Sequence, residues 1–180
     1  MTRDSQVGRP EDPVWREVRR LWGDQLAPIS PDFVGWNVSD FTRSFLTGIG
    51  LPTECPLLVT FYHDERLLKP LSMGGTNYFV VGDDYGTVLG INLETDELWA
   101  VDPNEQLPQC FVNSRVSDFV LFLALWESRQ PDLEEATTEG IKGIIRQLRW
   151  QFNSRDKHAL ENVVNWWNDV LNDVIRSLRE

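Results

Sequence analysis

Four side chains of the types that act as nucleophiles or bases are the first candidates for chemistry. They are two cysteines, Cys55 and Cys110, and two histidines, His63 and His158. A Cys–His pair can activate a thiolate when the two side chains are within hydrogen-bond reach. His63 follows a predicted strand in a charged loop, and His158 lies in the first turn of a predicted helix. No local motif links the four, so the sequence favours ordinary structural roles over a catalytic dyad.

Metal and phosphate sites have equally little support. Structural zinc sites use cysteine and histidine ligands in local pairs, and the four residues above are far apart. The acidic segment 82–88 lacks the alternating ligands and the terminal glutamate of an EF-hand loop, so a hairpin turn is the better interpretation. The glycines at 48–50 and 74–75 are not followed by the Lys-Ser/Thr pair of a phosphate loop. We expect no catalytic residue, no metal and no cofactor.

Carboxylate side chains are concentrated in one central segment of the sequence. Residues 83–139 contain thirteen acidic and two basic residues, an excess of eleven negative charges that equals the net charge of the whole chain, −11. The segments on either side are nearly neutral. Six of the carboxylates lie in or beside predicted turns, where they would project into solvent: Asp83, Asp84, Glu94, Asp96, Glu97 and Glu105.

Two interpretations of these carboxylates remain open. Acidic hairpin tips commonly do no more than keep a protein soluble. Alternatively, the acidic loops act as an electrostatic decoy that covers the phosphate-binding cleft of a basic nucleic-acid enzyme, since complementary charge speeds association and excludes wrong partners. Trp166 is a further candidate for partner binding. It lies off the apolar stripe of the predicted last helix, so it either packs beneath another helix or is an exposed aromatic anchor.

Composition limits the classes of partner and compartment. The 28 acidic residues against 17 basic ones disfavour direct binding to nucleic acids or membranes and suit a basic partner. The first thirteen residues contain no apolar secretory signal, and the longest apolar run, 119–126, is too short to span a bilayer. Two cysteines without a paired motif favour a reducing compartment. We therefore expect a cytoplasmic protein.

The pattern of apolar residues predicts helices on both sides of a group of strands. Asp12 and Pro13 are the cap and the first residue of a helix that Gly23 ends, and a short helix is predicted over 40–47. Short links rich in turn residues can join only antiparallel neighbours. The predicted strands cover residues 57–62, 77–82, 87–93, 98–102 and 110–113. Strands that cluster between helices, instead of alternating with them, indicate an α+β fold.

The C-terminal third is predicted to be helical again. Ser117 can cap a helix over 118–130 that Pro131 ends, and a weaker helix covers 133–152. The last helix has the clearest pattern, with apolar residues in one broad stripe at about 100° per residue: Leu160, Val163, Val164, Trp167, Val170, Leu171, Val174, Ile175 and Leu178. The 180 residues fit a single domain, with residues 1–12 expected to form a flexible tail.

An ordered series of short segments resembles the fourth family of the SUKH superfamily of bacterial immunity proteins. The segments are FLTGIGLP (45–52), NYFVVGDDYGTVLGINLETDELWAVD (77–102) and FVNSRVSDFVLFL (111–123), with AL (159–160) and WW (166–167) in the closing helix. The positions that carry the resemblance are Gly50-Leu51-Pro52, Gly82-Asp83, Ile91, Val101-Asp102, Asn113-Ser114 and Phe119. One departure is the turn between 93 and 98, which lacks a glycine that many relatives have there.

The resemblance implies a SUKH-like central antiparallel sheet with flanking helices. It also implies an immunity protein that neutralises a cognate polymorphic toxin, often a nuclease or nucleic-acid deaminase, by blocking its active site. The family has no agreed catalytic residues, so structural roles are expected for Asn113, which can bond nearby backbone, and Ser114, which can cap the next helix. The alternatives are a non-enzymatic regulatory or scaffold module that binds a protein, and an enzyme with an unrecognised site. The sequence does not predict the oligomeric state.

Overall fold

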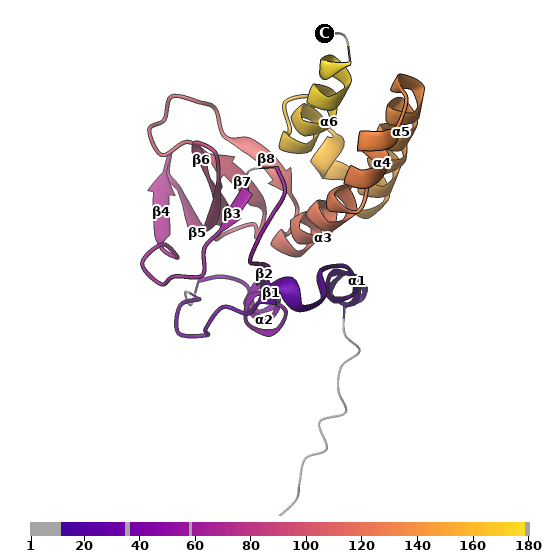
Figure 1. Cartoon of the computed structure of the whole chain (residues 1–180). Coiled ribbons are helices and arrows are strands. Elements are labelled where there is room, and N and C mark those ends of the chain that lie inside the picture. The colour runs from indigo at the N-terminus through magenta and orange to yellow at the C-terminus, as the bar shows by residue number, and fades with distance from the viewer. Residues whose placement is uncertain (1–11, 35–36, 58, 179–180) are drawn as a thin grey trace, which may run out of the picture.

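An antiparallel sheet faces a layer of helices in the computed structural model, which describes residues 12–34, 37–57 and 59–178 (Figure 1). Within these residues the sheet has the order β3-β5-β6-β7-β8, with β4 paired to β5, and every pairing is antiparallel. Its strands are β3 (Val59–Phe61), β4 (Pro70–Met73), β5 (Thr76–Asp84), β6 (Thr87–Asn92), β7 (Leu98–Val101) and β8 (Cys110–Asn113). A separate two-stranded ribbon joins β1 (Leu26–Ala27) to β2 (Leu51–Pro52).

The antiparallel order determines which turns lie at which end of the sheet. The β5–β6 turn and the β7–β8 loop lie at one end, and the β6–β7 turn lies at the other. Because β6 has six residues, these two ends are about 20 Å apart at roughly 3.3 Å per residue. An irregularity between Val80 and Gly82 shifts the register of β5 against β6 and bends the sheet there.

The predicted meander is confirmed, with shifts of one or two residues at the strand ends. The five predicted strands correspond to β3, β5, β6, β7 and β8. Sequence reasoning missed β1, β2 and β4, which have two to four residues each. Strands this short are below the length at which alternation can be recognised, and two of them contain a proline, which usually argues against a strand.

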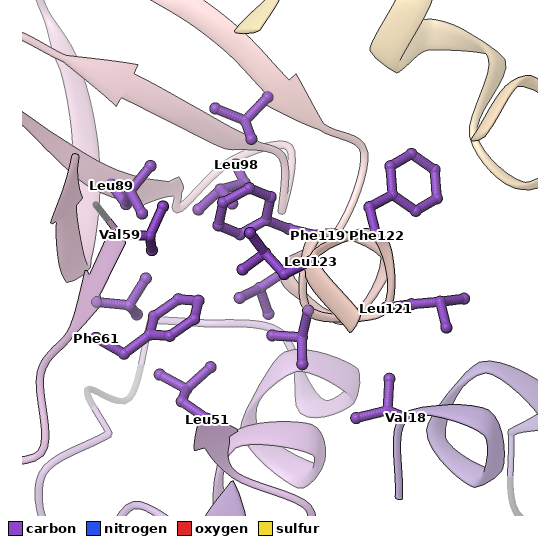
Figure 2. Close-up of a cluster of buried hydrophobic side chains, with 14 of the residues drawn as sticks. Val18, Leu51, Val59, Phe61, Leu89, Leu98, Phe119, Leu121, Phe122 and Leu123 are labelled. Atoms are coloured by element: carbon purple, nitrogen blue, oxygen red, sulfur yellow. The ribbon is translucent and has the colours of Figure 1, made fainter. Parts of the chain in front are cut away.

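The helices pack on one face of the sheet and below its edge (Figure 1). They are α1 (Pro13–Trp22), α2 (Asp40–Gly48), α3 (Val116–Glu127), α4 (Gln130–Glu135), α5 (Thr138–Arg155) and α6 (Trp166–Ser177), with 3-10 segments η1 (Gly23–Gln25) and η2 (Lys157–Leu160). α3 lies at the centre of the core, and nine of its twelve side chains are buried. In Figure 2, Phe119 and Leu123 point toward the sheet, whereas Phe122 points toward the C-terminal helices. Phe122 stacks on Phe152 of α5 with ring centroids 4.0 Å apart.

The predicted start of α1 is confirmed. Asp12 Oδ1 accepts a hydrogen bond from the backbone N–H of Val14 at 2.8 Å, Pro13 occupies the first turn, and Gly23 ends the helix with a φ of 60°. The predicted helix over 40–47 is α2. Of the expected tail, residues 1–11 lie outside the described part of the chain, and Asp12 belongs to the helix cap instead.

The predicted boundaries of the next two helices are wrong. α3 ends at Glu127, and Pro131 does not stop a helix but lies in the first turn of α4. Proline is favoured there because the first backbone N–H groups of a helix have no intrahelical acceptor. Thr137 then caps α5, which extends to Arg155. The predicted helix over 133–152 is therefore two helices, one on each side of this cap.

The single last helix predicted from Leu160 onward is also wrong. η2 ends at Leu160, and α6 begins only at Trp166. Between them, the side-chain amides of Asn165 and Asn168 donate to carbonyl oxygens in and just after η2. Such side-chain bonds compete with helical backbone bonds. Val163, expected in the buried stripe, is consequently 81% exposed.

The architecture is α+β, as predicted, with a central antiparallel sheet and flanking helices. Within the described residues, none of the helices has the length and apolar composition needed to cross a membrane.

Candidate functional site

The structure divides the six predicted turn carboxylates between the two ends of the sheet. Asp83 and Asp84 end β5, and Glu105 lies in the β7–β8 loop at the same end. The other three carboxylates, Glu94, Asp96 and Glu97, lie in the β6–β7 turn at the opposite end. Because the two groups of carboxylates lie at opposite ends of the sheet, a single rigid cleft could contact one group more readily than both groups at once.

At the β6–β7 end, two of the three carboxylates have partners within the chain. Asp96 accepts hydrogen bonds from Ser39 Oγ at 2.8 Å and Thr42 Oγ1 at 2.7 Å, which ties this turn to the start of α2. Its φ of 67° shows how the turn forms without a glycine, since aspartate tolerates the left-handed region. Glu97 accepts from Trp99 Nε1 at 3.3 Å. Glu94 is exposed.

At the β5–β6 end, Asp84 holds a more specific position. It is partly buried, and its carboxylate accepts a hydrogen bond from Trp166 Nε1. Burial raises the pKa of Asp84 above its ordinary value, and repulsion from Asp83 acts in the same direction, whereas the tryptophan hydrogen bond opposes it. Glu105 is exposed and Asp83 is partly exposed. Asp84 thus joins the acidic end of the sheet to the first residue of α6.

Trp166 is buried, which is the first of its two predicted alternatives. Only 7% of its surface is exposed, and its ring packs edge-on against Phe119 at 5.3 Å and Trp167 at 4.7 Å between centroids. As the first residue of α6, it has its indole N–H directed at Asp84. Its side chain therefore does not protrude from the surface as an anchor, but forms part of the floor of the groove described next.

A groove runs between this end of the sheet and α6. Two adjoining cavities of 510 and 390 Å³ share Asp84, Trp166 and Asp169 in their linings. The first continues along α6 to Asp173 and Val174, and the second opens toward Cys110. All charged residues among the described residues that line the groove are carboxylates. We call the groove, with Tyr85 and Glu105 beside it, the acidic groove surface.

Exposed apolar side chains gather at the same place. Among the described residues, six large apolar side chains are exposed, and three of them, Leu107, Val163 and Val164, line the groove. A fourth, Tyr85, is 85% exposed in the β5–β6 turn directly after Asp84. Its φ of 36° is uncommon for an aromatic residue. Exposed apolar side chains grouped beside carboxylates are typical of a protein-binding surface.

Sequence reasoning missed the α6 part of this surface. Asp169 and Asp173 lie one turn apart on the exposed side of α6, and Arg176 forms ion pairs with both, at 3.3 Å to Asp169. These residues belong to the segment 140–180, in which basic residues slightly outnumber acidic ones. The only available signal was the four-residue spacing of the two aspartates on a helix.

The four nucleophile and base candidates are not arranged as a catalytic dyad. Cys110 Sγ is 3.1 Å from the carbonyl oxygen of Val164, and burial raises the pKa of its thiol to about 11. Burial likewise raises the pKa of Cys55 to about 12. A reactive cysteine needs a lowered pKa. His63 Nε2 lies 3.2 Å from the carbonyl oxygen of Pro52, and His158 Nδ1 lies 2.7 Å from a carboxylate oxygen of Glu161.

Asn113 and Ser114 have structural roles, though different ones from those predicted. The carboxylate of Asp156, at the end of α5, accepts from Asn113 Nδ2 at 3.0 Å, from the backbone N–H of Ser114 at 2.7 Å and from Ser114 Oγ at 2.8 Å. Asn113 Oδ1 accepts from Trp167 Nε1 at 2.8 Å. The predicted helix cap by Ser117 is wrong, because that side chain is buried within the first turn of α3.

The described residues contain no cluster of three or more histidine, cysteine, aspartate or glutamate side chains able to hold a metal ion.

Similarity to known proteins is limited to one protein family. A family model described as SUKH-4 immunity protein matches residues 16–173. No curated protein and no solved structure matches the chain. The matched range spans β1 to β8 and α2 to α5, together with most of α1 and α6.

Proposed function

This chain belongs to the SUKH-4 immunity protein family, and on that premise we propose that it binds a cognate protein toxin through the acidic groove surface and neutralises it by covering the toxin's active site. The observation that carries this proposal is the coincidence of a lining whose charged residues are all carboxylates, exposed apolar side chains and a groove at one end of the sheet. No step of this mechanism requires catalysis by the immunity protein.

Charge complementarity favours a basic toxin, such as a nuclease or a nucleic-acid deaminase. Enzymes that act on nucleic acids carry positive clefts for phosphate groups. The chain has a net charge of −11, and the groove is lined by the carboxylates of Asp84, Asp169 and Asp173. The carboxylates at the β6–β7 end are about 20 Å away, so they add to the long-range attraction without contacting the same cleft. A cytoplasmic location follows from this proposal, because such a toxin acts on nucleic acid inside the cell.

Apolar contacts at the groove are expected to hold the complex once it has formed. Leu107 and Val163 protrude beside the groove, and Trp166 with Val170 forms part of its floor. Buried apolar anchors near the centre of an interface contribute most of the binding energy, whereas charges at its rim chiefly raise the association rate. The two kinds of residue should therefore affect different rate constants.

The charge test needs the cognate toxin domain as the binding partner, and we expect it to be encoded in the neighbourhood of this chain's gene. The double variant Asp169→Lys, Asp173→Lys is expected to slow association about tenfold or more at low salt, and the effect should shrink as the salt concentration shortens the Debye length toward about 8 Å. A matched control is Asp132→Lys, Glu135→Lys on α4, where Asp132 is also paired with an arginine, Arg129 at 3.2 Å. Association rates of all three proteins, measured by stopped flow, decide the matter. Equal rates for the groove variant and the control would refute binding through α6.

The apolar test changes a different rate constant. Leu107→Ser with Val163→Ser should speed dissociation of the toxin about tenfold or more, because exposed side chains at a binding surface affect affinity and not folding. Leu67→Ser, which removes an exposed leucine outside the groove, is the matched control. An unchanged dissociation rate for the double variant would place the apolar contact elsewhere. If the protein binds no toxin and instead binds a regulatory protein, that result would support the scaffold alternative.

Protection by the immunity protein should not depend on its cysteines or histidines. Each of Cys55→Ser, Cys110→Ser, His63→Ala and His158→Ala is expected to protect cells from the toxin at the parental level, provided that circular dichroism shows a folded protein. The reason is that both thiols have raised pKa values, while His63 bonds to a backbone carbonyl oxygen and His158 to the carboxylate of Glu161, so neither histidine is bonded to a cysteine in these contacts. Complete loss of protection in a folded variant would contradict a mechanism by binding alone.

A further inference from the structure

A pocket with two aromatic rings lies on the side of the sheet that faces away from the helical core. Leu98 and Ala100 of β7 are buried in that core, so Trp99 between them points to the opposite face. Phe111 of β8 pairs with Trp99 across the strands, and the two rings meet edge-on with centroids 5.3 Å apart. Both rings are only partly buried, and they line a cavity of 370 Å³ beside η2. We call this cavity the aromatic pocket.

Two carboxylates also line the aromatic pocket. Glu97 Oε2 accepts hydrogen bonds from Thr95 Oγ1 at 2.9 Å and from Trp99 Nε1 at 3.3 Å, so neutral donors hold this carboxylate in place. Glu161 comes from the segment after η2, and its carboxylate lies 2.7 Å from His158 Nδ1. Among the described residues, no lysine or arginine lines the pocket or pairs with either glutamate. These carboxylates are therefore available to a cation from another molecule.

A nearly buried amide in the same lining has an oxygen without a donor. Asn165 is 6% exposed, and its Nδ2 donates to the carbonyl oxygen of His158 at 2.7 Å, which fixes the amide in place. Asn165 lies directly before α6, but its side chain does not cap that helix. Within the described part of the chain, no donor reaches Asn165 Oδ1. An acceptor on a buried side chain normally has a partner, so a donor in the pocket would complete its hydrogen bonding.

These groups together select a flat, positively charged donor. A guanidinium group has five N–H donors, no acceptor and a permanent charge, and its planar surface packs on aromatic rings. An ammonium group has the charge but not the planar surface. The volume of 370 Å³ lies near the lower end of the roughly 300–1,000 Å³ of ligand pockets, which suits one long side chain better than a large cofactor. We propose that the aromatic pocket binds the guanidinium group of an arginine side chain of the cognate toxin.

The position of the pocket fits an arginine at the rim of the toxin's cleft. One short segment separates the pocket from the acidic groove surface, since Asn162 lines the pocket whereas Val163 and Val164 line the groove. A toxin that covers the groove can therefore insert an arginine from beside its cleft into the pocket. The assignment to the toxin rests on the proposed function, whereas the preference for guanidinium rests on the lining alone.

The first test uses a small arginine compound, so it does not depend on the toxin. The probe is N-acetyl-arginine methylamide, and the control compound is N-acetyl-citrulline methylamide, in which an uncharged urea group replaces the guanidinium. Binding is read from the indole Nε1–H signal of Trp99 in ¹⁵N-labelled protein, assigned by its loss in Trp99→Phe. We expect the arginine compound to shift this signal with a dissociation constant on the order of 5 mM. The citrulline compound should leave the signal unchanged at the same ionic strength.

Charge-neutral variants of the two glutamates test the lining. Glu97→Gln and Glu161→Gln should each weaken binding of the arginine compound about fivefold or more, because each keeps an acceptor and removes a charge. Glu94→Gln is the matched control, since Glu94 is exposed in the same turn as Glu97 but does not line the pocket, and it should bind like the parent. An unshifted Trp99 signal at about ten times the expected dissociation constant would overturn the guanidinium site. Equal shifts by the two compounds, or parental binding by both glutamine variants, would do the same.

The second test asks whether the arginine belongs to the toxin. Glu97→Gln should speed dissociation of the toxin about tenfold, whereas Glu94→Gln, which removes one charge from the same turn, should not. If Glu97→Gln binds the arginine compound weakly but releases the toxin at the parental rate, the pocket takes a free guanidinium compound and the assignment to the toxin is overturned. The groove variant Asp169→Lys, Asp173→Lys should bind the arginine compound like the parent. Failure of the pocket and failure of the groove are therefore distinguishable.

Discussion

Replacing Asp156 with alanine is expected to lower the free energy of unfolding by about 3–5 kcal/mol. The carboxylate of Asp156 is buried and accepts three hydrogen bonds, from Asn113 Nδ2, the backbone N–H of Ser114 and Ser114 Oγ. Alanine would leave these donors without an acceptor, and each buried donor left unpaired costs about 1–3 kcal/mol. The loss should appear as a lower midpoint in urea denaturation, with the slope unchanged.

The matched control for this variant is Asp156→Asn, which separates hydrogen bonding from charge. The amide oxygen of asparagine can accept from Asn113 and the backbone of Ser114, while its NH₂ group can donate to Ser114 Oγ, which is also an acceptor. We therefore expect a change within about 1 kcal/mol. If the asparagine and alanine variants were equally unstable, the negative charge and not the hydrogen bonds would hold α5 to the end of β8.

Asp118→Asn is expected to stabilise the protein, and only at neutral and alkaline pH. Asp118 lies in the first turn of α3, where burial raises the pKa of its carboxyl from 3.8 to about 7. Repulsion from Asp156 and Asp12 adds to this rise, while Arg115 and Arg155 oppose it. The folded protein must either bind a proton at this position or hold a partly buried charge. Asparagine removes that requirement at similar volume.

The direction of the pH dependence follows from the raised pKa. Well below pH 3.8, the ordinary pKa of an aspartate, the carboxyl is protonated in both states, so Asp118→Asn and the parent should be about equally stable, and the difference should still be small at pH 4. As the pH rises from 4 to 7, the folded parent retains a proton that the unfolded chain loses, and its stability falls relative to the variant. Above pH 7 the difference should level off at about 2–3 kcal/mol. This figure is below the roughly 4 kcal/mol that three pKa units represent, since the side chain is only partly buried.

Urea denaturation of both proteins at pH 4, 5.5, 7 and 8.5 tests this expectation. Only the difference between parent and variant is informative, because other carboxyls such as Asp102, with its lowered pKa, change stability in the opposite direction. A difference that is already complete at pH 4, or that shrinks with rising pH, would show that the carboxyl of Asp118 is ionised without cost. The Asp156→Asn variant should reduce the difference, because it removes a like charge that raises the pKa of Asp118.

Much of the fold was predictable because local patterns determine whether an element forms. Alternation and turn residues identified the five longer or better bounded strands, and the Asp12-Pro13 pair identified the start of α1. The predictions failed where side chains compete for backbone groups. Pro131 looked like a helix end but lies at a helix start, and the asparagines around 162–168 interrupt a helix that the apolar stripe alone predicted.

The candidate site was only partly predictable, because its residues are neighbours in space and not in sequence. The acidic excess of the segment 83–139 was visible, and so was the candidacy of Asp84. Trp166 was recognised as unusual, but its hydrogen bond to Asp84, across 82 positions of the chain, was not. The neighbouring residues in the sequence do not distinguish Asp84, which lies beside a groove, from Asp96, which accepts a hydrogen bond from Thr42 in the first turn of α2.

The sequence by itself determined the fold class, the family resemblance, the net negative charge and the order of an antiparallel meander. These depend on composition and on residues within a few positions of each other. The tertiary structure alone decided which carboxylates share a surface, because the meander places successive turns at opposite ends of the sheet. It also brought Asp169 and Asp173 beside Asp84, since burial of Trp166 and Trp167 against α3 fixes the position of α6. Contacts between distant segments follow from how apolar faces pack together, and no local pattern encodes them.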